Sequence, residues 1–204
     1  MINPPQPKKI PKVHMAHGDE RIDDYYWLRD DTRKDPEVIS YLEAENQYLE
    51  GWFASKNDCR QDIYDELVSF IPPHEVSMKI KYGDYLYFSE ISADQQYKTY
   101  YRELDGTKEL VLDVNALAKG LDYFNVASLT PSSDNLLIAY AEDLSGRREY
   151  NIKVKDLASG KIIDSAIERS SGSVVWDKKN TCIYYAQKDP VTLIENKVYK
   201  HKLG

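Results

Sequence analysis

The sequence lacks the patterns by which most enzymes are recognised. Its 204 residues contain no G-x-S-x-G nucleophile elbow, no H-E-x-x-H motif, no paired C-x-x-C motif and no glycine-rich phosphate loop. Ser173 follows Gly172, but no glycine stands two positions later. The histidines are scattered without ligand spacing, at His14, His17, His74 and His201. We therefore predict no catalytic residue, no metal site and no other cofactor in this chain.

Cysteines are few, and long apolar runs and an excess of positive charge are missing. Cys59 and Cys182 are far apart, which predicts two free thiols in a reducing compartment. No apolar run approaches the length of a membrane span, and residues 1–11 lack the apolar core of a secretory signal. The net charge of -7 argues against nucleic-acid binding. We expect a soluble, cytoplasmic protein with no membrane or nucleic-acid partner.

The first part of the chain carries helix signals after a proline-rich start. Four prolines within residues 2–13 predict an extended arm, and residues 16–33 are dense in charged and aromatic side chains. Asp35 followed by Pro36 predicts the start of a helix. Its apolar residues recur at helical spacing, at Val38, Tyr41, Leu42, Tyr48, Leu49, Trp52 and Phe53.

A second helix is predicted from about Asp58. It should end at Pro72-Pro73, because proline removes a backbone donor and clashes with the preceding turn. We expect this helix to bury four residues, Ile63, Leu67, Phe70 and Ile71. Beyond it the composition changes to that of strands and turns. The predicted domains are therefore a helical extension over residues 1–73 and a β domain over residues 74–204.

The β region is organised around a unit at residues 133–167 that the chain repeats. Two strand candidates enclose a polar loop at residues 142–148, and a turn and a third strand candidate follow. The same order recurs upstream and downstream, and aligning Leu104, Leu157 and Leu203 gives a period of roughly 50 residues. This period is typical of propeller blades, with an ordinary β-sandwich as the alternative. The region holds about two and a half blades, fewer than the four or so of a small propeller, so we expect a fragment of a longer protein.

Arg147 and Arg148 are the candidate binding residues. They follow Gly146 in the loop between two strand candidates, and arginine can bind carboxylates through two parallel hydrogen bonds. The alternative is that they are solvated loop charges paired with neighbouring carboxylates, at Glu142, Asp143 or Glu149.

Motifs along the whole chain resemble the oligopeptidase B group of the prolyl oligopeptidase family of serine peptidases. The most specific is the segment HGDxRIDDYYWLRDD at residues 17–31. The match continues at residues 35–38 and 41–46, then through the pattern L-S-x-R-R-x-Y at residues 144–150. It ends with residues 175–176, 190–193 and 198–204. The pattern around Arg147 and Arg148 favours their contact with bound peptide.

The resemblance implies a mainly β fold with an N-terminal α-helical extension and a partial seven-bladed β-propeller. In this family the propeller covers a C-terminal α/β-hydrolase domain, which carries the Ser, Asp and His of the active site. That domain is absent from these 204 residues, so we expect the chain alone to be inactive. The implied partners are this hydrolase domain and short basic peptides, cleaved after Lys or Arg.

In such an enzyme the propeller restricts access to the active site. Two alternatives remain open, a proline-specific peptidase of the same family and a propeller that serves only as an interaction module.

Overall fold

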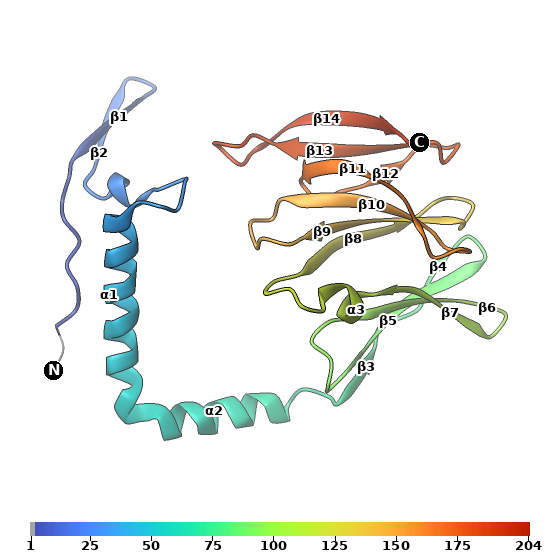
Figure 1. Ribbon diagram of the computed structural model, residues 1–204, viewed down its shortest axis with the longest axis horizontal. Helices are drawn as coiled ribbons and strands as arrows, with labels where there is room; N and C mark the ends of the chain where they lie inside the picture. The colour runs from blue at the N-terminus through green and yellow to red at the C-terminus, as the bar shows by residue number, and fades with distance from the viewer. Residues whose placement is uncertain (1–2) are drawn as a thin grey trace. The chain divides into compact units, whose positions relative to one another are not determined.

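The computed structural model describes residues 3–204 and divides into two compact units between Ile71 and Pro72. We call residues 3–71 the helical unit and residues 72–204 the blade unit, and each is described by itself (Figure 1). Among the described residues, no helix is both long enough and apolar enough to cross a membrane.

The helical unit opens with a hairpin that the sequence patterns did not reveal. Strands β1 (Lys12–Ala16) and β2 (Asp19–Asp23) pair antiparallel, joined by His17 and Gly18. Both turn residues have positive φ, 55° and 82°, as a tight two-residue hairpin turn requires. The short 3₁₀ turn η1 (Tyr26–Leu28) follows.

The predicted extended arm is held inside this unit by hydrogen bonds to its backbone. The Ile10 amide donates to the Asp24 carbonyl at 2.8 Å, and the Trp27 indole donates to the Lys8 carbonyl at 2.8 Å.

Helix α1 (Pro36–Phe53) begins where the sequence predicts. The Asp35 carboxylate accepts hydrogen bonds from the amides of Glu37 and Val38, at 2.8 and 3.4 Å, and so satisfies two donors of the first turn. The 3₁₀ turn η2 (Ala54–Lys56) separates α1 from α2 (Asn57–Ser69), which begins one residue before the predicted Asp58.

The predicted burial of the second helix is wrong. Ile63 is 53% exposed and Phe70 is 72% exposed, and Leu67 and Ile71 are exposed as well. The apolar spacing of α2 is present, but within the described part of the helical unit no layer covers it. On α1, Val38 is buried and the Tyr41 ring contacts the Trp27 ring edge-on at 6.2 Å, whereas Leu42 and Trp52 are about half exposed.

The blade unit begins with a sheet whose first strand is interrupted. Strands β3 (His74–Val76) and β4 (Ile80–Tyr82) both pair with β5 (Tyr85–Ser92). Strands β6 (Thr99–Leu104) and β7 (Thr107–Asp113) extend this sheet antiparallel. The short helix α3 (Val114–Ala118) leads out of this first blade.

The second blade has four antiparallel strands and the third has three. The second consists of β8 (Asn125–Pro131), β9 (Leu137–Asp143), β10 (Tyr150–Asp156) and β11 (Ile162–Ser170). The third consists of β12 (Val175–Trp176), β13 (Cys182–Lys188) and β14 (Glu195–Lys202). One residue pair, Ser170 with Gln187, joins β11 to β13.

The repeat predicted from the sequence is confirmed. Leu104 ends β6, Leu157 directly follows β10 and Leu203 directly follows β14, so each closes the third strand of a blade. The sequence patterns missed the first strand of each blade and helix α3.

The two faces of β9 show how the blades stack. Ile138 and Tyr140 are buried against the first blade, together with Val111 and Leu112. The alternate residues Ala139 and Ala141 belong to a second cluster that includes residues of β13. A strand with both faces buried between successive sheets fits a blade stack, in which each sheet lies between two others. A two-layer sandwich would leave one face of this sheet in solvent.

Candidate functional site

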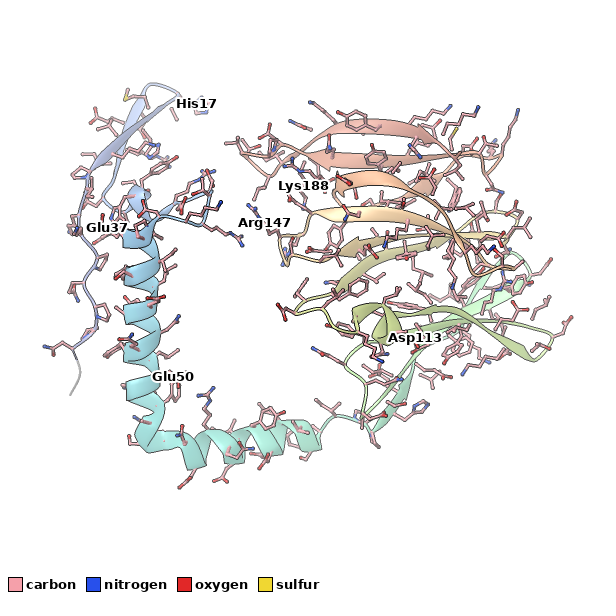
Figure 2. All side chains as sticks on the ribbon, viewed as in Figure 1. His17, Glu37, Glu50, Asp113, Arg147 and Lys188 are labelled. Carbon is pink, nitrogen blue, oxygen red and sulfur yellow. The ribbon has the colours of Figure 1, made fainter. Side chains whose placement is uncertain are left out.

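The candidate site is the loop between β9 and β10, which carries Arg147 and Arg148. Both side chains are exposed, and Figure 2 shows Arg147 at the tip of the loop, at the same end of the strands as Lys188. Within residues 3–204, neither guanidinium group forms a hydrogen bond or an ion pair that would neutralise it.

The loop takes its shape from one buried carboxylate, Asp143 at the end of β9. Its Oδ1 accepts hydrogen bonds from the Ser145 amide at 2.8 Å, the Ser145 hydroxyl at 2.9 Å and the Gly146 amide at 3.0 Å. Its Oδ2 accepts from the Arg148 amide at 2.7 Å. Four donors from the loop therefore converge on one side chain that is fully buried.

The charge state of Asp143 follows from these contacts. Burial alone raises the pKa of Asp143, because it disfavours the carboxylate. Hydrogen bonds from Ser145, Arg148 and Gly146 outweigh that effect and leave the pKa of Asp143 below its ordinary value. The side chain is therefore ionised at neutral pH.

The carboxylates that could neutralise the two arginines have other partners. Glu142 lies 2.5 Å from the Lys153 ammonium, and Glu149 lies 3.5 Å from the Arg169 guanidinium. Asp143 binds loop amides, as described above. The two guanidinium groups are thus left as positively charged, two-point donors in solvent.

The third blade also contacts this loop. The Lys188 ammonium at the end of β13 donates to the Arg148 carbonyl at 3.2 Å. In the next loop along this end of the blade unit, Asp189 accepts from the amides of Val191 and Thr192 at 2.9 and 2.8 Å. The same capping therefore fixes adjacent loops.

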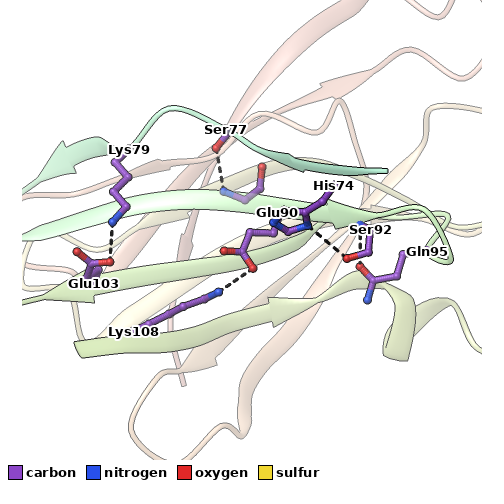
Figure 3. Close-up of polar contacts among 9 residues, drawn as sticks. His74, Ser77, Lys79, Glu90, Ser92, Gln95, Glu103 and Lys108 are labelled. Carbon is purple, nitrogen blue, oxygen red and sulfur yellow. Dashed lines mark hydrogen bonds and ion pairs between the residues drawn. The ribbon is translucent and has the colours of Figure 1, made fainter. Parts of the chain in front are cut away.

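Two of the four histidines, His74 and His201, make contacts between strands. His74 and Ser92 face each other across β3 and β5 at 3.5 Å, on the sheet face shown in Figure 3. His201 lies 2.7 Å from Asp164 and joins β14 to β11, two strands of successive blades. Among the described residues no group of three potential ligands could hold a metal ion.

Sequence analysis considered Asp143 only as an ion partner of the arginines, not as the cap of their loop, and it did not identify Lys188. The local signal for Asp143 is an Asp at the end of an apolar run, followed by Leu-Ser-Gly, which is a composition typical of an Asx-capped turn. Lys188 has no local signal, since its contact with Arg148 depends on how two blades stack.

Known proteins resemble this chain over nearly its whole length. Residues 4–204 match the model of the prolyl oligopeptidase N-terminal β-propeller domain. Dipeptidyl aminopeptidase BI of Pseudoxanthomonas mexicana is 35% identical, with 98% of this chain and 30% of that protein aligned. Protease 2 of Moraxella lacunata is 34% identical, again over 98% of this chain and 30% of that protein.

The fold has a solved counterpart as well. Oligopeptidase B from Leishmania major superposes with a TM-score of 0.88 at 31% identity, over 99% of this chain and 31% of that one. This chain thus spans about a third of the length of these relatives. The family match and the stacked blades together show that the chain belongs to the prolyl oligopeptidase family of peptidases, of which it represents the N-terminal β-propeller region.

Proposed function

We propose that this chain is the propeller region of a serine peptidase that hydrolyses short peptides after Lys or Arg. The support is the family match, with similarity both to Protease 2 and to oligopeptidase B. In the complete protein, a serine would attack the scissile carbonyl, a histidine would move the proton and an aspartate would orient the histidine. These groups would lie outside the 204 residues, on an α/β-hydrolase domain.

The propeller would act by exclusion and by positioning. A stack of blades in front of an active site admits short or unfolded peptides and rejects folded ones, so that specificity arises from what does not fit. Arg147 and Arg148 would contact the bound peptide inside the enclosed space. The observation that carries this proposal is their two exposed guanidinium groups, beside carboxylates that have other partners.

The expected ligand of the arginine pair is the C-terminal carboxylate of the peptide or a backbone carbonyl. Arginine offers a planar set of donors that matches a carboxylate in two-point geometry. A short peptide has its free carboxylate near the scissile bond, whereas a long chain does not. The pair would therefore favour short substrates.

The 35% identity to a dipeptidyl aminopeptidase supports a second candidate function, release of dipeptides from a free N-terminus. Fluorogenic substrates separate these activities in the complete protein. Rapid cleavage of blocked arginine substrates supports the first proposal. Preference for unblocked dipeptide substrates supports the second, and preference for proline would favour the proline-specific alternative.

The contact with peptide is tested by Arg148→Ala and Arg147→Ala in the complete protein. Lys161→Ala is a control, because Lys161 is an exposed cation in the turn between β10 and β11, at the end of the same blade away from the arginine pair. Loss of one charge-assisted contact should raise KM about fivefold to tenfold and leave kcat within about twofold. A KM equal to that of the parent in both variants would leave the arginines as solvated charges.

A further inference from the structure

We infer that Asp143 and Lys188 are positioning residues, which set the arginine pair in a fixed geometry to receive a peptide carboxylate. This inference rests on the proposed function of Arg147 and Arg148. Neither Asp143 nor Lys188 would touch the substrate. Each would act through the backbone of Arg148, one from its own blade and one from the next.

The backbone of Arg148 adopts a conformation that its sequence does not favour. Its φ is 57°, in the left-handed region, where a residue with a Cβ atom is disfavoured unless its surroundings hold it there. The Asp143 carboxylate holds the Arg148 amide at 2.7 Å, and the Lys188 ammonium holds the Arg148 carbonyl at 3.2 Å. The backbone amide and the backbone carbonyl of Arg148 are therefore both held by side chains of other residues.

The buried carboxylate also keeps the arginines available. Its Oδ1 already accepts three hydrogen bonds and its Oδ2 accepts the Arg148 amide, so its charge is engaged by the loop backbone. An exposed carboxylate at this place could form an ion pair with the guanidinium groups and compete with a peptide. The loop instead presents two cationic side chains, while the buried Asp143 carboxylate beside them binds backbone amides.

A second capped turn in the same blade provides the control. Asp156 ends β10 and accepts hydrogen bonds from the Ser159 amide at 2.7 Å and the Ser159 hydroxyl at 2.6 Å. It caps the turn between β10 and β11, whereas Asp143 caps the loop between β9 and β10. Because successive antiparallel strands turn at opposite ends of a sheet, the Asp156 turn lies at the end away from the arginine pair.

The decisive variant is Asp143→Asn in the complete protein. The amide of Asn keeps one acceptor for Ser145 and Gly146, but places an NH₂ group against the Arg148 amide, where two donors cannot bond. Using a short peptide with a free C-terminal carboxylate, we expect KM to rise about threefold to tenfold with kcat within about twofold. The same peptide with a C-terminal amide should show little change in KM.

Asp156→Asn should lower the melting temperature without changing KM for either peptide, which separates loss of a turn cap from loss of positioning. Lys188→Met tests the second support and avoids disturbing a buried group, should Asp143→Asn fail to fold. It should raise KM for the carboxylate peptide, and Lys188→Arg, which keeps a donor, should restore it.

The outcomes distinguish this inference from the proposal beneath it. If Arg148→Ala raises KM for the carboxylate peptide while Asp143→Asn and Lys188→Met do not, the positioning role is wrong and the proposed function stands. If Arg148→Ala and Arg147→Ala leave KM unchanged, the proposed function of the pair fails, and the inference fails with it.

Discussion

The two units of this protein follow the same local rules but differ in what they bury. In the blade unit, β9 has Ile138 and Ala139 fully buried on opposite faces. In the described residues of the helical unit, Val38 is the one buried hydrophobic residue, although both α1 and α2 carry apolar residues at helical spacing. Local signals thus determine where a helix begins, while burial depends on the presence of a partner surface.

The two units differ in how far along the chain the surface that buries their apolar residues lies. A blade buries its faces against the sheets that precede and follow it, so contacts form between segments about 50 residues apart. A helical face such as that of Ile63 and Leu67 has no such neighbour in the repeat. The known relatives are about three times as long as this chain, and we propose that the remainder of the protein covers these helices.

The largest difference between the units should appear when one buried and one exposed isoleucine are truncated. Ile138→Ala removes a side chain that is fully buried between two blades, and should cost about 3 kcal/mol of unfolding free energy. Ile63→Ala, at a position 53% exposed, should change the unfolding free energy by less than about 0.5 kcal/mol. Urea unfolding followed by tryptophan fluorescence and far-UV circular dichroism measures both. Equal losses would contradict the contrast between the units.

A smaller loss is expected from the polar contact between the first two blades. Asn135 has a φ of 58°, accepts a hydrogen bond from the Tyr87 hydroxyl at 2.8 Å, and accepts another at its carbonyl from Arg102 at 2.5 Å. Asn135→Ala should cost about 2 kcal/mol, because it removes the acceptor of the Tyr87 hydroxyl proton and strains the turn.

Asn135→Gly restores the backbone freedom, and so should cost only about 1 kcal/mol, the hydrogen-bond part of the loss. Urea midpoints of the two variants give this difference. If Gly is as damaging as Ala, the turn conformation contributes nothing.

Acid should weaken the blade unit through its capping carboxylates. Hydrogen bonds hold the pKa values of Asp134, Asp156, Asp177 and Asp189 below the ordinary value of about 3.9. Because the unfolded chain then binds more protons in acid, their contribution is complete above about pH 5 and is lost as pH falls through the lowered pKa values. Thermal melts between pH 7 and pH 2 should show this fall. Asp156→Asn should show a smaller fall than the parent, and an identical pH profile would refute the role of Asp156.

The sequence predicted more of the fold than of the site. Asp35 and Pro36 located the start of α1, and the leucine repeat located the third strand of each blade. Strand β8, the first strand of the second blade, was not predicted, because its apolar residues, such as Val126 and Leu129, are interspersed with small polar ones. Burial of Phe70 was predicted wrongly because spacing alone does not show what lies opposite a face. The contact of Lys188 with Arg148 joins residues 40 apart, which no local pattern predicts.

A loss of about 1 kcal/mol is expected in the helical unit from Asp35→Ala, which removes the acceptor of the first turn of α1. Asp35→Ser should retain most of the stability, because serine also caps helices. Far-UV circular dichroism at 222 nm, recorded during a thermal melt, reports the loss. An unchanged melt for Asp35→Ala would show that the cap contributes nothing.

The smallest effect should come from the exposed face of the first blade. Lys108 pairs with Glu90 at 2.7 Å and Lys79 pairs with Glu103 at 2.7 Å, as Figure 3 shows. Pairs open to solvent contribute little and are screened by salt, so Lys108→Met should change stability by less than about 1 kcal/mol. Melts in low and high salt would measure this change, and a larger, salt-independent loss would show that the pair is not a solvated one.

Hydrogen exchange of the purified 204-residue chain, followed by mass spectrometry, tests the contrast between the units most directly. We predict strong protection of amides in β9 and β10, which exchange only when the blade unit unfolds, and weak protection throughout α2. In the complete protein, α2 should gain protection while β9 and β10 keep theirs. Protection of α2 equal to that of β9 in the 204-residue chain would contradict the account, since the helix would then be stable without a further partner.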